Sequence, residues 1–135
     1  MASILLVEDD DELRSLLKEL LTSSGYEVLE TSNGTRACEV YQRDRFDLVI
    51  TDVVMPDIDG LEVIMELQRL DKNVGIIAIS GAGQDKGKDY LRIAKKLGAQ
   101  FTLSKPFTNA DFLDAVSLTL ENLAKRPPPD DSVHT

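Results

Sequence analysis

The feature that most constrains the fold is a strict alternation of short apolar runs with helix-spaced apolar patterns. The helical patterns occupy residues 13–21, 35–43, 60–70, 89–97 and 108–123, and Gly25 ends the first of them. The apolar runs predict strands at Ser3–Val7, Tyr26–Glu30, Phe46–Thr51, Gly75–Ser80 and Phe101–Ser104. Five β-α units in alternation predict an α/β fold, a doubly wound, five-stranded parallel sheet with helices on both faces.

Length, charge and residue counts narrow the function. The chain has 135 residues, a formal net charge of −9, one cysteine (Cys38) and one histidine (His134). The acidic charge argues against nucleic acid as a partner, and no apolar run is long enough to cross a membrane. A lone histidine next to the C-terminus excludes a Ser-His-Asp triad and a two-histidine zinc site. We expect a cytoplasmic protein.

The domain organisation follows from where the apolar pattern stops. Residues 1–124 are expected to form one domain, with a last helix opened by Thr108 and Asp111 at capping-box spacing. Residues 125–135 contain three prolines and no apolar period, so we expect a disordered tail. Such a tail fits either a natural single-domain protein or a piece of a longer chain.

Polar side chains stand where the predicted strands end. The first strand runs into Glu8 and Asp9, the third into Asp52, the fourth ends at Ser80, and the fifth is followed by Lys105. In a doubly wound sheet these ends meet at one edge, where ligands bind. Crowded carboxylates attract a cation, and all-oxygen ligands with room for a phosphate favour Mg²⁺. An aspartate in such a site can itself become phosphorylated.

Four stretches of the sequence resemble the receiver domain of bacterial two-component response regulators, a CheY-like family. They are "ILLVEDDDELRSLL", "DLVITDVVMPDIDG", "GIIAISG" and "GAQFTLSKPF", and the resemblance covers Ser3 to about Leu123. It implies a flavodoxin-like (βα)5 fold with strand order 2-1-3-4-5. It also implies a Mg²⁺-dependent phosphoprotein of a phosphorelay.

The resemblance assigns roles to individual residues. Asp52 takes the phosphoacceptor position, with Ser80 and Lys105 as the hydroxyl and ammonium that engage the phosphoryl group. The metal-ligand positions are Glu8 acting through water, Asp9, Asp52 and the backbone carbonyl of Val54. The Lys105–Pro106 peptide is expected to be cis. Met55, Pro56, Asp59 and Gly60 fill the loop after the acceptor, with Asp57 and Asp59 solvated.

Two departures from the family pattern are visible. The position of the switching aromatic residue is held by Thr102, and Phe101 should point to the opposite face of its strand. The segment between Ser80 and the Gly98-Ala99 pair is longer than in typical members of the family and is rich in glycine and lysine, so we expect an elongated, mobile loop from Gly81 to Lys88. It satisfies neither phosphate-loop fingerprint, because the glycine spacing is wrong and Asp89 follows Lys88.

The preferred hypothesis is a signalling switch and not an enzyme. Asp52 would receive a phosphoryl group from a phosphohistidine of a sensor histidine kinase or histidine phosphotransfer protein, and later lose it by autodephosphorylation. Output would be binding to an unidentified protein target, and a homodimer through the face of the fourth helix, fifth strand and fifth helix is compatible with the pattern. Two alternatives are a phosphorylation-independent scaffold and a Mg²⁺-dependent aspartyl-phosphate phosphohydrolase. Against the hydrolase, Val54 stands where a second aspartate is usual.

Overall fold

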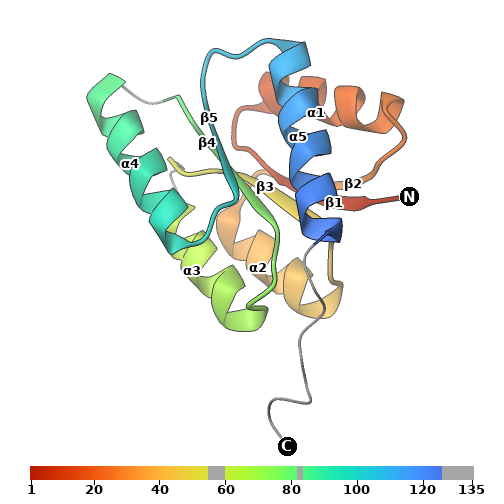
Figure 1. Cartoon of the computed structure of the whole chain (residues 1–135), viewed down its shortest axis with the longest axis horizontal. Helices are drawn as coiled ribbons and strands as arrows, with labels where there is room; N and C mark the ends of the chain where they lie inside the picture. Colours follow the sequence, from red (N-terminus) through yellow and green to blue (C-terminus); the bar gives the residue numbers. More distant parts are fainter. Residues whose placement is uncertain (55–59, 82–83, 126–135) are drawn as a thin grey trace, which may run out of the picture.

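The computed structural model describes residues 1–54, 60–81 and 84–125, and for residues 84–88 the backbone alone. Its strands are β1 (Ser3–Val7), β2 (Glu27–Thr31), β3 (Leu48–Asp52), β4 (Ile76–Ser80) and β5 (Phe101–Ser104). Its helices are α1 (Asp11–Ser23), α2 (Gly34–Arg43), α3 (Gly60–Leu70), α4 (Gln84–Leu97) and α5 (Asn109–Ala124). Strands and helices alternate along the chain as the sequence predicts (Figure 1).

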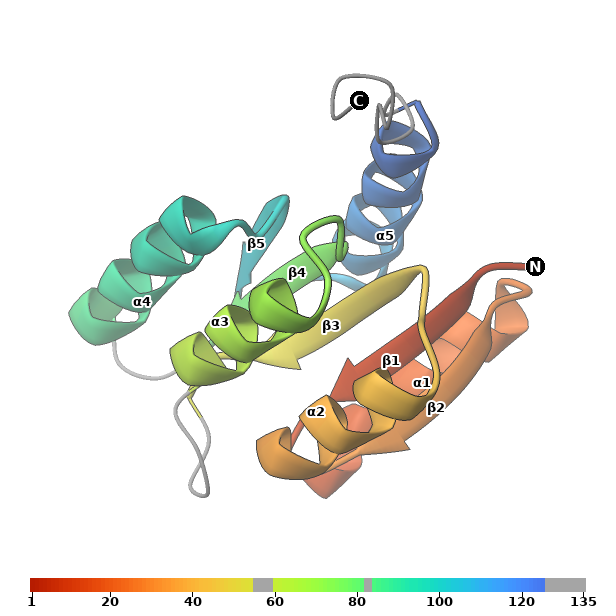
Figure 2. The same ribbon diagram turned by 90° about the horizontal axis from the view of Figure 1, so that it is seen from below.

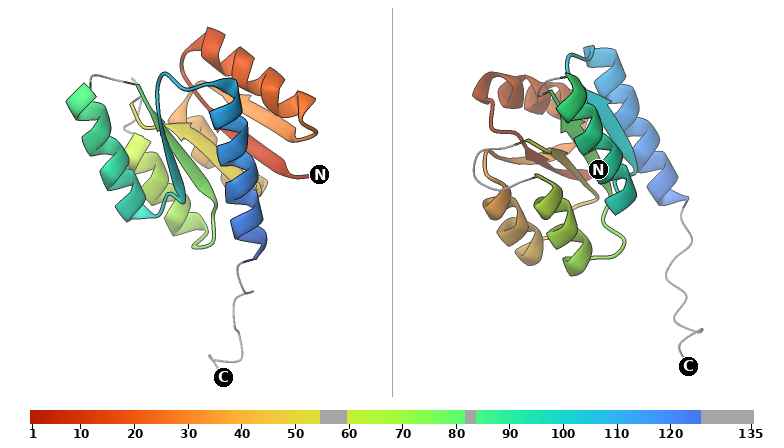
Figure 3. Two further views of the ribbon diagram at one scale, coloured as in Figure 1. Left: turned by 45° about the horizontal axis from the view of Figure 1, so that its top comes forward. Right: turned by 90° about the vertical axis from the view of Figure 1, so that its left-hand side faces the viewer.

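The strands form one parallel sheet in the order β2-β1-β3-β4-β5, which confirms the expected topology. Helices α1 and α5 cover one face, and α2, α3 and α4 cover the other (Figures 2 and 3). Parallel strands connected by helices on both sides are buried on both faces. Accordingly, every residue of β3 and of β4 is buried.

Two apolar clusters hold these layers together, one on each face of the sheet. On the α1 and α5 side, Leu17, Leu21 and Phe112 pack on alternate residues of the strands, including Ile50 and Ile79. The opposite cluster joins the other strand residues to α2, α3 and α4, including Leu5, Val49, Val40, Leu67 and Ala94. The alternation of strand side chains thus divides each apolar run between two cores.

Polar side chains cap the starts of α1 and α5, the helices that follow Asp9 and Lys105 in the chain. The Asp10 carboxylate accepts hydrogen bonds from the amides of Glu12 and Leu13 and so caps α1. Thr108 caps α5 by accepting from the Asp111 amide at 3.0 Å, at the position that the sequence predicts. These side chains satisfy amides that have no partner within the helix.

The structure corrects one prediction. Residues 84–88 belong to α4, whereas the sequence predicts a loop from Gly81 to Lys88 and a helix that begins only at Asp89. The prediction took the glycine and lysine content of this segment as a sign of a loop. One glycine inside a helix costs only about 1 kcal/mol relative to alanine, and the glutamine and lysine residues of this segment favour a helix.

Several expectations fall outside the part of the chain that the structure describes. These concern residues 82 and 83 of the expected loop, the tail from residue 126, and Met55, Pro56, Asp57 and Asp59 after β3. None of the described helices is long and apolar enough to span a bilayer.

Candidate functional site

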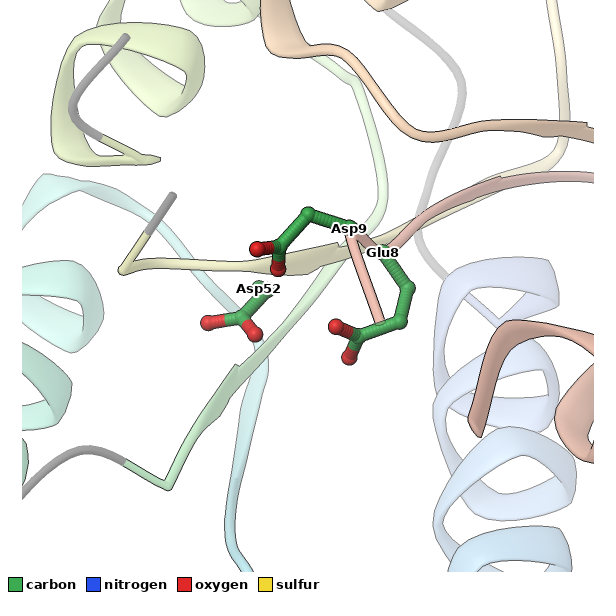
Figure 4. A group of neighbouring side chains, drawn as sticks. All are labelled: Glu8, Asp9 and Asp52. Atoms are coloured by element: carbon green, nitrogen blue, oxygen red, sulfur yellow. The ribbon is translucent and has the colours of Figure 1, made fainter. Parts of the chain in front are cut away.

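Three carboxylates meet at the carboxyl ends of β1 and β3. Glu8 and Asp9 follow β1 directly, and Asp52 is the last residue of β3. One carboxylate oxygen from each lies within 4.8 Å of the others (Figure 4). Glu8 and Asp52 are buried and Asp9 is exposed, so the cluster is open to solvent on the side of Asp9.

Lys105 bridges the two buried carboxylates. Its ammonium donates a hydrogen bond to Asp52 Oδ2 at 2.8 Å and lies 3.0 Å from Glu8 Oε1. The second contact is an ion pair without hydrogen-bond alignment, because Glu8 Oε1 has no hydrogen-bond partner among the described residues. Burial opposes the charge of Lys105, but its bond to Asp52 and the charges of Asp52 and Glu8 outweigh that effect and raise its pKa.

Backbone amides hold the second carboxylate oxygen of Asp52 and of Glu8. The Val54 amide donates to Asp52 Oδ1 at 2.9 Å, and the Asp10 amide donates to Glu8 Oε2 at 3.1 Å. Burial raises the pKa of Glu8 to about 7, and the nearby charge of Asp52 adds to this effect. The Asp10 amide and Lys105 act in the opposite direction without cancelling it.

Ser80 ends β4, the strand next to β3, and its hydroxyl is unusual. The side chain is buried, and Oγ has no hydrogen-bond partner among the described residues. Burying a hydroxyl without a hydrogen-bond partner costs free energy, and a bound group that accepts its hydrogen bond would recover that cost. A hydroxyl donor therefore lies at the end of the strand beside the one that carries Asp52.

Two glycines allow the close approaches on which the site depends. A Cβ on Gly60 would overlap the Cα atom of Val53, so α3 can start against the end of β3 because position 60 is glycine. A Cβ on Gly81 would lie 2.5 Å from Lys105 Cδ and 2.8 Å from Lys105 Cβ. The Gly81 contact is not predictable from the sequence, since it depends on the path of the Lys105 side chain.

Thr102 lies away from this edge of the sheet. It pairs in register with Ala78, two residues before Ser80, and shares the face of the sheet to which Ala78 contributes. Phe101 and Leu103 pack against the opposite cluster, so the expected orientation of Phe101 is confirmed. The Lys105–Pro106 peptide is cis, as the resemblance implied.

The arrangement suits Mg²⁺ chemistry. Carboxylate oxygens that converge from two strand ends, with one side open to solvent, match the hard oxygen ligands and retained waters that Mg²⁺ prefers. The Lys105 ammonium and the buried Ser80 hydroxyl are groups that can bind phosphoryl oxygens. Together they can accommodate a phosphorylated aspartate.

Comparisons with known proteins identify the family of the chain. Residues 4–117 match the response regulator receiver domain. The chain is 33% identical to the sporulation initiation phosphotransferase F of Bacillus subtilis, over 84% of this chain and 89% of that protein. It is 36% identical to the chemotaxis protein CheY of Halobacterium salinarum, over 84% of this chain and 92% of that protein.

A solved structure shows the same architecture. The solution structure of the beryllofluoride-activated NtrC4 receiver domain dimer superposes with a TM-score of 0.83 at 28% identity, covering 91% of this chain and 99% of that one. The sheet order, the acidic cluster and the sequence match over residues 4–117 thus lead to one conclusion. The chain belongs to the response regulator receiver domain family.

Proposed function

We propose that this protein is a phosphorylation-controlled switch in which Asp52 accepts a phosphoryl group. The observation that carries the proposal is the position of Lys105, whose ammonium joins Asp52 and Glu8 beside a buried hydroxyl that has no partner among the described residues. The donor is a phosphohistidine of a sensor histidine kinase or a histidine phosphotransfer protein. The name of the Bacillus subtilis relative, a phosphotransferase, supports such a partner.

The transfer converts one phosphate linkage into another. An oxygen of the Asp52 carboxylate attacks phosphorus, a P–O bond forms, and the P–N bond to the donor imidazole breaks with its electron pair returning to nitrogen. Lys105 then pairs with a phosphoryl oxygen, and the Ser80 hydroxyl donates to another. Hydrolysis of the acyl phosphate by water restores the carboxylate and releases inorganic phosphate.

Glu8, Asp9, Asp52 and the Val54 carbonyl would hold Mg²⁺. When bound, the ion offsets the negative charge that accumulates on the transferring oxygens. The chain's own residues hold the carboxylates in place: the Val54 amide fixes one oxygen of Asp52, and the Asp10 amide fixes one oxygen of Glu8.

The output in this proposal is a change in protein binding. Phosphorylation would shift an equilibrium at the end of β4 and on α4, β5 and α5, because Ser80 and Lys105 end or follow strands of that region. Self-association through this face is part of the proposal, supported by the dimer of the NtrC4 receiver domain. Two of its elements carry exposed apolar side chains, Ile93 on α4 and Leu118 on α5. The location proposed is the cytoplasm, where a single unpaired cysteine such as Cys38 is ordinary.

The test is the intact mass after incubation with acetyl phosphate and Mg²⁺. One added phosphate on the parent protein, absent from Asp52→Asn and absent with a chelator, supports the proposal. No adduct from acetyl phosphate or from a purified phosphohistidine donor would favour the scaffold alternative. Continuous consumption of general phosphate esters would indicate a phosphohydrolase instead.

A further inference from the structure

We propose that Arg14 is a positioning residue for the acidic site. It acts by donating to the Glu8 carbonyl and to Glu30, near the end of β2, and so connects the two. This inference rests on the proposed function, since it concerns the proposed Mg²⁺ ligands. Arg14 lies on α1, one turn after the helix begins, and its side chain is only 17% exposed.

The guanidinium of Arg14 bonds to three different segments. Nη1 donates to the Glu8 carbonyl at 2.9 Å, Nε donates to Glu30 Oε1 at 3.0 Å, and Nη2 donates to Asp11 Oδ1 at 2.7 Å. Glu30 is held from its other side by Lys18, whose ammonium lies 2.7 Å from Oε2. The turn after β1, the first turn of α1 and the edge strand β2 are therefore fixed to one planar group.

The Glu8 carbonyl is the point at which this network reaches the site. The peptide between Glu8 and Asp9 is a rigid plane, so a bond that holds the Glu8 carbonyl limits the movement of both flanking Cα atoms, from which the two side chains project. Those side chains carry two of the three carboxylates that converge within 4.8 Å. Mutual repulsion favours spreading such carboxylates apart, and the bond from Arg14 resists that movement.

Helix capping does not account for the geometry. The start of α1 is capped by Asp10, whose carboxylate accepts from the Glu12 and Leu13 amides. Arg14 reaches back past this cap to a carbonyl outside the helix. The planar guanidinium of arginine can donate to three acceptors in different directions at once. The compact ammonium of lysine lacks this fixed array of donors, so it cannot be expected to hold all three.

The experiment is calorimetric titration of the folded proteins with MgCl₂. We expect Arg14→Lys to bind Mg²⁺ about 10-fold more weakly, the lower range for loss of a group that orients a metal ligand. Glu30 is not one of the three clustered carboxylates, yet Glu30→Gln should weaken binding in the same direction. The double variant should bind no more weakly than Arg14→Lys alone, because both changes break one chain of contacts.

Arg36→Lys is the matched control, since Arg36 pairs with Glu39 at 3.5 Å on an exposed part of α2. It should bind Mg²⁺ like the parent. Thermal midpoints in chelator separate positioning from stability. Lower midpoints with parent-like Mg²⁺ affinity in both Arg14→Lys and Glu30→Gln would overturn the inference. A parent protein that binds no Mg²⁺ would instead overturn the metal site of the proposed function, and the inference with it.

Discussion

The ammonium of Lys105 lies 2.8 Å from Asp52 and 3.0 Å from Glu8, so one cation is shared by two buried carboxylates at the ends of different strands. Removing one partner of such a group leaves the others buried without compensation. The neighbouring amides of Val54 and Asp10 satisfy single oxygens only. The metal-free site therefore depends on Lys105 for charge balance.

Replacing Lys105 with methionine keeps most of the apolar stem and removes the charge. We expect the free energy of unfolding in chelator near neutral pH to fall by about 1–3 kcal/mol, the usual cost of leaving a buried polar group unsatisfied. Saturating Mg²⁺ should restore part of the loss, since a ligand that binds only the folded state stabilises it. Urea denaturation followed by circular dichroism measures both quantities.

Arg92→Gln serves as the control for that variant, because Arg92 pairs with Asp89 on the surface of α4 and both side chains are more than half exposed. Its unfolding free energy should stay within about 0.5 kcal/mol of the parent. Equal losses in the two variants would contradict the role given to the buried pair.

Ser80→Ala should separate stability from phosphoryl chemistry. The Ser80 hydroxyl is buried without a hydrogen-bond partner among the described residues, so its removal should leave stability unchanged or slightly raised. Loss of the donor to the phosphoryl group should nevertheless slow phosphorylation by acetyl phosphate, by about 10-fold or more. The adduct is followed by intact mass against time.

Thr119→Val is a matched control for Ser80→Ala. Thr119 lies on α5, and its buried hydroxyl likewise has no partner in the described part of the chain. This variant should phosphorylate at the parental rate. Slower phosphorylation in both variants would show that any buried hydroxyl affects the protein, and the specific role of Ser80 would be lost.

Glu8 should make the metal-free protein less stable as pH rises. Burial raises the pKa of Glu8 to about 7 in the folded protein, above the 4.5 of an ordinary glutamate. At pH values between 4.5 and about 7, the folded state therefore retains a proton on Glu8 that the unfolded state has already lost. The contribution to stability is full below the unfolded pKa and is lost as pH rises through about 7.

The measurement for Glu8 is the unfolding free energy in chelator at about pH 5 and about pH 8, for the parent and for Glu8→Gln. The parent should lose more stability over this interval than the variant. Mg²⁺ affinity of the parent should rise over the same interval, because a protonated carboxyl cannot bind the ion. Identical pH profiles of stability for the two proteins would rule out the raised pKa.

The fold and the location of the site can be predicted from the sequence because both follow from local patterns. Short apolar runs place the strands and helix-spaced apolar residues place the helices. The polar residues at the ends of four of these runs lie at the same edge of the sheet. The start of α4 at Gln84 was missed, since a glycine-containing segment gives no clear period. The roles of Arg14 and Gly81 could not be predicted, because each depends on where a distant side chain or carbonyl lies.

Gly81→Ala should displace Lys105 from Asp52. The added Cβ would lie 2.5 Å from Lys105 Cδ and 2.8 Å from its Cβ, too close for any real contact. The Lys105 backbone cannot retreat easily, because its amide donates to the Ser80 carbonyl at 2.9 Å. Rotation of the Lys105 side chain can relieve the contact with Cδ, whereas the contact with Cβ requires the backbone at Gly81 or Lys105 to shift. Either movement displaces the ammonium, so phosphorylation by acetyl phosphate should slow even at saturating Mg²⁺.

A double-mutant cycle with Lys105→Met tests whether Gly81 acts through the lysine. If the alanine affects only the position of the ammonium, it should have little further effect on the phosphorylation rate once the ammonium is gone. Mg²⁺ affinity should change less than the phosphorylation rate in Gly81→Ala, because the carboxylates keep their amide partners from Val54 and Asp10. If the losses in phosphorylation rate are additive, Gly81 acts independently of the lysine. Glycine would then be required by the backbone of the turn after β4 and not by the position of Lys105.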